Sequence, residues 1–143
     1  PAYNQRYETL RKNGQNLNDM LADLHAGIIQ TLIDETNCLN VIVDRFANQE
    51  VLRKRVKKSL PDAQLLQVPK AESDIAVAAA SIIARYFFLQ RIENLSHTYG
   101  MTIPKGAVHV VDPGRQFVRN YGKQQLRNVA KLHFRTTSDI LAI

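Results

Sequence analysis

The sequence predicts an α/β domain, and three observations lead to that prediction. Two short apolar runs, at residues 39–43 and 64–68, flank an amphipathic segment at residues 48–60, which is the pattern of a strand, a helix and a second strand. An apolar stretch rich in Ala follows at residues 75–84, and Ala favours helix over strand. The 143 residues are enough for one domain with a hydrophobic core.

Two helices are expected before the first strand. Residues 4–12 and 17–34 have helical periodicity and are separated by Asn13 and Gly14, which together signal a turn. In the second segment apolar residues recur every three or four positions, and we expect this stripe to face a core. Its members are Leu17, Met20, Leu21, Leu24, Ile28 and Leu32.

The run at residues 39–43 is β-branched and apolar throughout most of its length, as expected of a strand that is buried on both faces. It ends at Asp44, so a carboxylate is expected at the carboxyl end of the strand. The helix at residues 48–60 is expected to bury its apolar side. That side consists of Leu52, Val56 and Leu60. Pro69 closes the second strand.

Residues 72–99 are expected to form a central, buried helix, because residues 75–84 are apolar on almost every side. Gly100 is suited to end this helix as the C′ residue. Asp112 and Pro113 resemble an N-cap followed by proline at the first helical position.

That next helix is expected to end near Gly122, and one more short helix is expected at residues 124–131.

The chain carries a net charge of +6 that is unevenly distributed. Residues 1–59 contribute +2, residues 60–100 contribute −1 and residues 101–143 contribute +5. This surplus favours an anionic partner that docks on the last segment.

Cys38 is the single cysteine, which excludes an internal disulfide framework and a four-cysteine zinc site. No apolar run reaches membrane-spanning length, so we expect a cytoplasmic protein with no membrane partner.

Asp44 and Glu72 are the first candidates for a functional site. Ligands of open α/β sheets bind outside the carboxyl ends of strands, where Asp44 lies, but Asp is also a common cap of the next turn and helix. Glu72 precedes the Ala-rich helix, where a carboxylate is stabilised by the helix dipole alone. Asp74 fits that structural role equally well and is the competing candidate.

If Asp44 and Glu72 converge, their oxygens suit Mg²⁺ or Mn²⁺. Sites of this kind hydrolyse phosphodiesters between two metal ions, and two carboxylates are too few to hold both ions.

The four histidines show no spacing typical of metal ligands and are expected to be structural or exposed. They are His25, His97, His109 and His133.

Basic side chains form two groups. The run at residues 53–58 is expected to be the solvated face of an amphipathic helix rather than a phosphate-binding patch. A better candidate for contact with a nucleic-acid backbone is a series that recurs every four residues and would form one edge if the helix continued. This series comprises Lys123, Arg127, Lys131 and Arg135, with Lys105 in a preceding loop.

The segment at residues 70–86, KAESDIAVAAASIIARY, closely resembles the signature of type 2 ribonucleases H, and specifically of the ribonuclease HIII subgroup. Four further segments agree with the subgroup in order and spacing, so the resemblance extends over nearly the whole chain. They are residues 3–4 (YN), 41–47 (VIVDRFA), 104–107 (PKGA) and 130–134 (AKLHF). The sequence departs from the subgroup at Val108, where another glycine is usual.

The resemblance implies a ribonuclease H-like mixed sheet flanked by helices, and a metal-dependent nuclease that cuts the RNA strand of RNA·DNA hybrids. The family holds its metal ions with four carboxylates, and by motif position Asp44 is similar to the third and Glu72 to the fourth. The first two belong to an Asp-Glu motif on an opening strand, and this sequence contains no such motif. The pair at residues 34–35 lies at a helix end, too close to Asp44 to replace it.

We therefore expect residues 1–143 to be a single catalytic domain that is incomplete at its amino-terminal end, from an enzyme that is a monomer when intact. Four basic residues are candidate contacts with the hybrid backbone, although two of them, on or beside the Ala-rich helix, could instead form structural ion pairs. They are Lys70, Arg85, Lys105 and Lys131.

The alternative to a nuclease is a noncatalytic nucleic-acid-binding module or a degenerate nuclease remnant, favoured by the absent carboxylate pair and the positive final segment. We expect the 143 residues alone to be inactive.

Overall fold

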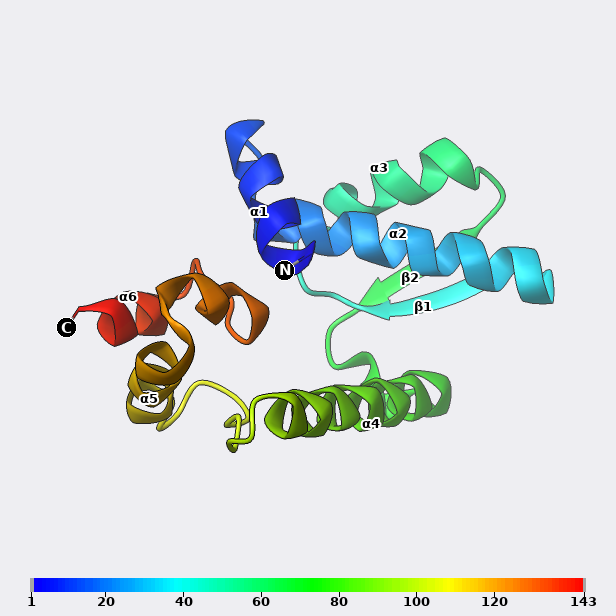
Figure 1. Cartoon of the computed structure of the whole chain (residues 1–143). Coiled ribbons are helices and arrows are strands. Elements are labelled where there is room, and N and C mark those ends of the chain that lie inside the picture. The colour runs from blue at the N-terminus through cyan, green and yellow to red at the C-terminus, as the bar shows by residue number, and fades with distance from the viewer. Residues whose placement is uncertain (1, 143) are drawn as a thin grey trace. The chain divides into compact units, whose positions relative to one another are not determined.

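The structure is a computed structural model that describes residues 2–142 and is rich in helix (Figure 1). Its elements are α1 (Ala2–Lys12), α2 (Leu17–Thr36), β1 (Asn40–Asp44), α3 (Gln49–Ser59), β2 (Gln64–Val68), the 3₁₀ helix η1 (Ala71–Ser73), α4 (Ile75–Thr98), α5 (Val111–Tyr121), the 3₁₀ helix η2 (Lys123–Asn128) and α6 (Arg135–Leu141). Two compact units are present. The first unit is Arg6–Ile83, and the second unit is formed by residues 2–5 and 84–142.

The sheet of the first unit consists of β1 and β2, which pair in parallel from Asn40 opposite Gln64 to Asp44 opposite Val68. Parallel neighbours need a crossover connection, and α3 provides it. The order strand, helix, strand confirms the predicted α/β class, and the bounds of β2 match the prediction at both ends.

Helices α2 and α3 lie on the same side of this sheet (Figure 1). Together with β1 they enclose one apolar core, composed of Ala22, Ile29, Ile33, Val43, Leu52, Val56 and Ala63. On the other face, the paired residues Ile42 and Leu66 remain 38% and 53% exposed. The prediction that the first strand is buried on both faces is therefore wrong, since among the described residues only one face is covered.

The predicted apolar stripe of α2 is also corrected. Met20 is buried as predicted, but Leu24, Ile28 and Leu32 are exposed. Ile29 and Ile33 are buried in their place. Neighbouring residues on a helix point about 100° apart, so one helix can bury only part of so broad an apolar surface. The packing against α3 and β1 selects the side that contains Ile29 and Ile33.

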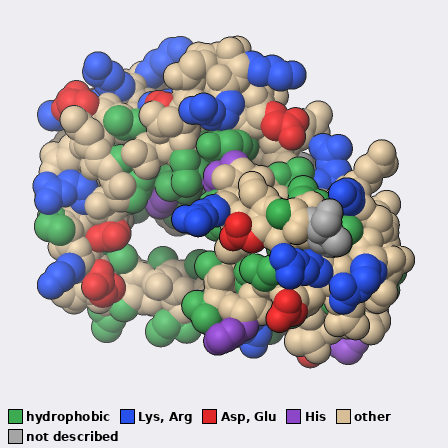
Figure 2. Space-filling view, turned by 90° about the vertical axis from the view of Figure 1, so that its left-hand side faces the viewer, with side chains coloured by type: hydrophobic (Ala, Val, Ile, Leu, Met, Phe, Trp, Pro, Cys, Tyr) green, Lys and Arg blue, Asp and Glu red, His purple; other side chains and the backbone are tan. Residues whose placement is uncertain are grey.

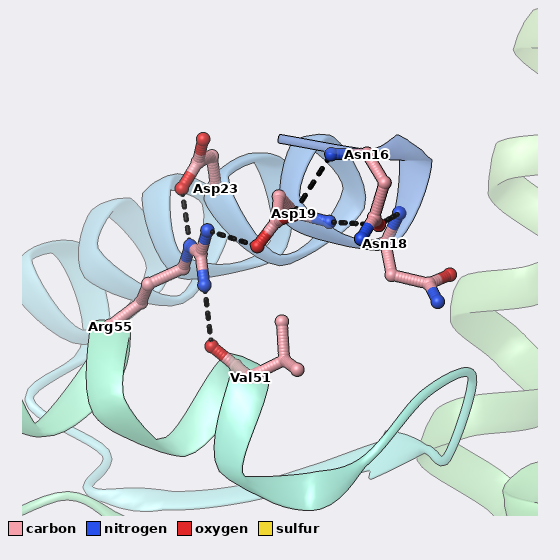
Figure 3. A network of polar contacts seen from close by, with 6 residues as sticks. All are labelled: Asn16, Asn18, Asp19, Asp23, Val51 and Arg55. Carbon is pink, nitrogen blue, oxygen red and sulfur yellow. Dashed lines mark hydrogen bonds and ion pairs between the residues drawn. The ribbon is translucent and has the colours of Figure 1, made fainter. Parts of the chain in front are cut away.

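A polar network joins α2 to α3 (Figure 3). The guanidinium of Arg55 donates to Asp23 (Nε to Oδ1, 2.5 Å) and to Asp19 (Nη2 to Oδ1, 3.0 Å). Asp19 also accepts the backbone N–H of Asn16, the N-cap of α2, in a capping box. That backbone hydrogen bond and the Arg55 side chain lower the pKa of Asp19. The network fixes the start of α2 against α3.

Helix α4 does not have the buried position that its composition predicts. None of its residues is buried, and Ile75, Ile82 and Ile83 are more than half exposed. Hydrophobic side chains are visible at the surface of the chain in Figure 2. An apolar helix is buried only if another element packs against it, and residues 80–88 are all exposed.

By length and composition alone α4 could also cross a membrane, with a mean hydropathy of 1.4 over its most apolar window. Its uncharged run stops at Arg85, however, and core helices of water-soluble proteins meet the same criterion. This property therefore assigns no membrane role.

The second unit has its own core around Phe117 and Leu126, with Ile92 and Leu95 of α4 packed against it. Helix α5 ends before Gly122 as predicted, but it begins at Val111.

Three details of this unit differ from the prediction. Asp112 and Pro113 lie inside the first turn of α5 instead of forming the cap and first position, since Val110 is the N-cap. The predicted helix at residues 124–131 is the 3₁₀ helix η2, which ends at Asn128. Helix α6 was not predicted.

Candidate functional site

Asp44 lies at the carboxyl end of β1 and is held there by the sheet. It pairs with Val68, and the next backbone N–H, that of Arg45, donates to the Val68 carbonyl (3.0 Å). The Asp44 carboxylate accepts the backbone N–H of Ala71 (3.2 Å), which links the ends of both strands. Asn48 rather than Asp44 caps α3, through a hydrogen bond from Glu50 N.

Glu72 lies in η1, directly after Ala71. Glu72 differs from Asp74 in its hydrogen bonds. The Asp74 carboxylate accepts the backbone N–H groups of Ala76 (2.9 Å) and Val77 (3.3 Å) at the start of α4. Asp74 therefore has the capping role that was one interpretation of both residues. Glu72 is exposed.

Asp44 and Glu72 reach the same edge of the sheet, because Asp44 bonds to the residue that precedes Glu72. Both side chains are exposed, and carboxylate oxygens are the ligands that divalent Mg²⁺ and Mn²⁺ prefer. Among residues 2–142 there is no group of three or more His, Cys, Asp or Glu side chains that could hold a metal ion. Asp44 and Glu72 therefore have the donor chemistry for part of a metal site, and two carboxylates are too few for a complete one.

The loop that follows Asp44 is anchored to α2. Phe46 stacks on His25 of α2, with ring centroids 4.9 Å apart and an interplanar angle of 20°. Burial lowers the pKa of His25, so its neutral form is favoured in the folded protein. This stack connects the core of the first unit to the segment that carries Asp44.

Lys70 directly precedes η1 and adopts a left-handed backbone conformation, with φ of 55°. This conformation is unfavourable for a residue with a Cβ atom and is concentrated at functional sites. Lys70 belongs to the same unit as Asp44 and Glu72.

The other three basic candidates belong to the second unit. The guanidinium of Arg85 lies over the ring of Phe88 (5.4 Å), one turn further along α4. Lys105 is exposed in the loop before α5. Lys131 is exposed after η2, and its ammonium lies over the rings of Tyr3 and Phe134.

The basic run at residues 53–58 makes contacts within the first unit. Arg53 forms an ion pair with Glu50, and Arg55 forms ion pairs with Asp19 and Asp23 of α2. Lys57 donates to the backbone carbonyls of Pro61 and Ala63. These contacts confirm the interpretation of the run as one face of a surface helix.

The predicted basic edge in residues 123–135 does not form. Because η2 ends at Asn128 and α6 begins at Arg135, no single helix joins Lys123 to Arg135.

Asn4 is a residue whose importance the sequence did not indicate on chemical grounds. It is buried in α1 and forms three hydrogen bonds with the backbone at residues 127–132. The neighbouring Tyr3 stacks on His133, with centroids 5.8 Å apart. The only sequence signal for Asn4 was its position in one of the motifs that resemble the ribonuclease HIII subgroup.

Comparison with known proteins gives one family. The family model described as Ribonuclease HII matches residues 2–137. The chain is 39% identical over 137 residues to Ribonuclease HIII of Protochlamydia amoebophila (strain UWE25), covering 95% of this chain and 46% of that protein. It is 40% identical over 141 residues to Ribonuclease HIII of Chlamydia pneumoniae, covering 96% of this chain and 47% of the relative.

Among solved structures, the fold is similar to the crystal structure of Bst-RNase HIII in complex with Mn²⁺. The TM-score is 0.84 at 33% sequence identity, and the match covers 97% of this chain and 47% of the other. The chain thus spans about half the length of the relatives that it matches.

Proposed function

This chain belongs to the ribonuclease HII family, and we propose that it forms the later part of a metal-dependent endonuclease that hydrolyses the RNA strand of RNA·DNA hybrids. The similarity to proteins named Ribonuclease HIII over 95% and 96% of the chain supports this substrate and reaction. Because those proteins are about twice as long, the activity is proposed for a protein that includes this chain and further residues.

The observation that supports the proposal is that Asp44, at the carboxyl end of β1, accepts a hydrogen bond from the residue that precedes Glu72. Asp44 is fixed by the ladder with Val68 and by its hydrogen bond to Ala71 N, so its position depends on the backbone of both strands. Glu72 follows one residue later and stays exposed. Two carboxylates held on rigid elements can orient a hydrated cation beside a phosphodiester.

We propose that Asp44 and Glu72 contribute oxygen ligands to Mg²⁺ or Mn²⁺. A divalent cation supplies, when bound, stabilisation of the negative charge that develops on the phosphate and its attacking and leaving oxygens. The proposed role of Asp44 and Glu72 is to hold the cation at the sheet edge. Lys70, Arg85, Lys105 and Lys131 are proposed contacts with the sugar-phosphate backbone of the hybrid, where Lys and Arg replace condensed counterions.

A two-metal mechanism needs more ligands than this chain provides. Two carboxylates cannot hold two ions about 3.5–4 Å apart on both sides of a phosphate, and residues 2–142 contain no larger cluster of metal-ligating side chains. We therefore expect the 143-residue chain to bind hybrid without cleaving it. The remaining carboxylates are proposed to come from residues outside this sequence.

The experiment compares the 143-residue chain with the full-length protein that contains it. Each is incubated with a labelled RNA·DNA hybrid, a DNA duplex of the same sequence, and Mg²⁺ or Mn²⁺, with EDTA as the metal-free control. We expect cleavage of the RNA strand by the full-length protein only, abolished by EDTA. A full-length protein that leaves the hybrid intact would refute the nuclease, and cleavage by the pure 143-residue chain would refute its inactivity.

The second candidate function is a noncatalytic nucleic-acid-binding module. It is favoured by the absence of a three-carboxylate cluster in residues 2–142 and by the charge of +5 on residues 101–143. This module would bind hybrid with an affinity that falls as salt rises, because phosphate contacts release counterions. The full-length protein would then bind hybrid but leave it uncut with either metal.

A further inference from the structure

Asn4 connects the beginning of the chain to a loop near its end. The side chain is only 4% exposed. Its Nδ2 donates to the backbone carbonyls of Arg127 (2.8 Å) and Ala130 (2.9 Å), and its Oδ1 accepts the backbone N–H of Leu132 (2.9 Å). A buried amide that uses both donors and its acceptor in this way fixes the backbone to which it bonds.

Lys131 is the residue that these contacts enclose. Asn4 holds the carbonyl before it and the N–H after it. The carbonyl of Lys131 itself accepts the backbone N–H of Phe134 (3.1 Å) and the hydroxyl of the buried Thr137 (3.2 Å). The backbone of Lys131 is therefore held on both sides, although the residue is exposed.

The side chain of Lys131 is oriented as well. Its Nζ lies 4.9 Å from the ring centroid of Tyr3 and 5.5 Å from that of Phe134. Aromatic faces attract cations at these distances. Tyr3 is the sequence neighbour of Asn4, so the same turn of α1 holds both the backbone and the side chain of Lys131.

The positive charge in this cluster belongs to Lys131. Burial, together with the nearby Lys131 ammonium, lowers the pKa of His133, so the histidine is favoured in its neutral form. An exposed cation that is fixed in this way loses little side-chain freedom when an anion binds, whereas a mobile surface lysine loses more.

We propose that Asn4 is a positioning residue that, with Tyr3 and Phe134, holds Lys131 in place to contact one backbone phosphate of the RNA·DNA hybrid. The inference rests on the proposed function, since it assigns a part of the substrate to this loop. Lys131 makes the contact, and Asn4 acts through it.

The test is the salt dependence of hybrid binding by the 143-residue chain, measured for the unmodified chain, Lys131→Ala, Asn4→Ala and the double variant. Loss of one phosphate contact reduces the slope of log K against log salt concentration by about 1. We expect this reduction in Lys131→Ala and a change in the same direction in Asn4→Ala. The double variant should match Lys131→Ala, because both substitutions remove the same contact.

Matched variants separate this role from general effects. Lys58→Ala removes one positive charge from the exposed face of α3 and should leave the slope unchanged. Tyr3→Leu removes the ring under the Lys131 ammonium and should reduce the slope, whereas Tyr3→Phe keeps the ring and should not. Amide hydrogen exchange at Leu132 should accelerate in Asn4→Ala, which reports the loosened loop in the absence of hybrid.

The outcomes distinguish the inference from the proposed function. If the unmodified chain does not bind hybrid, the proposed function fails for this chain. If it binds but Asn4→Ala keeps the full slope while Lys131→Ala does not, or the effects of the two substitutions simply add, Asn4 has only a structural role and the inference is wrong. An unchanged slope in Lys131→Ala would also overturn it.

Discussion

Helices α2 and α4 are equally apolar in composition, yet they have opposite environments. Helix α2 buries Met20, Ala22, Ile29 and Ile33, whereas no residue of α4 is buried. The difference lies in their neighbours, since α3 and β1 pack against α2, whereas residues 80–88 in the middle of α4 are exposed. Apolar sequence thus indicates that a helix requires a partner, and the rest of the fold determines whether that partner is present.

A matched pair of substitutions gives the largest expected effect. Ile29→Ala in α2 should lower the free energy of unfolding by about 2–5 kcal/mol, because it opens a cavity in the core of the first unit. Ile82→Ala in α4 should change it by less than about 0.5 kcal/mol, because Ile82 is 71% exposed. Urea unfolding followed by circular dichroism measures both. Equal losses would show that the middle of α4 is covered in solution.

An intermediate effect is expected from the network that fixes α2 to α3. Arg55→Ala should lower the free energy of unfolding by about 1–2 kcal/mol, because it leaves Asp19 and Asp23 partly buried without their cation. The control is Arg53→Ala on the same helix, whose pair with Glu50 is exposed and should contribute no more than about 0.5 kcal/mol. If both variants unfold at the same urea concentration, the Arg55 network does not stabilise α2.

The smallest expected effect is a pH dependence of the first unit. Burial lowers the pKa of His25 below its ordinary value of 6.5, so the unfolded chain binds a proton more readily than the folded chain. The stability is then fully present above pH 6.5 and falls as the pH decreases below it. His25→Gln should weaken this dependence, whereas His97→Gln, at an exposed position of α4, should not. Unfolding midpoints at pH 5 and pH 7.5 test this, and parallel losses in all three proteins would contradict it.

Local sequence signals were sufficient for the elements themselves. The period of the apolar residues located α2 and α3, the run rich in Ala located α4, the β-branched run located β1, and Gly122 ended α5 as expected. Burial was harder to predict, because the covering of the middle of α4 and of the outer face of β1 depends on contacts with elements distant in sequence. The start of α5 was misplaced because Asp112 and Pro113 are also well suited to the first helical turn.

The candidate site shows the same division. Asp44 could be located from the end of a strand, and Asp74 could not be distinguished from Glu72 until its hydrogen bonds with α4 were known. Asn4 gave no chemical signal, since its three partners are backbone groups 123 to 128 positions away. Contacts over such separations follow from the folded structure and leave no local pattern.

The most direct test of the nuclease proposal is the initial rate of RNA cleavage in an RNA·DNA hybrid with Mn²⁺, measured for the full-length protein that contains this chain. Asp44→Asn and Glu72→Gln should each lower the rate by about 10²-fold or more, because each removes one anionic group that stabilises charge in the transition state. Asp62→Asn, in the exposed turn before β2, should cleave at the unmodified rate. Undiminished cleavage by Asp44→Asn would contradict the assignment of Asp44 as a metal ligand.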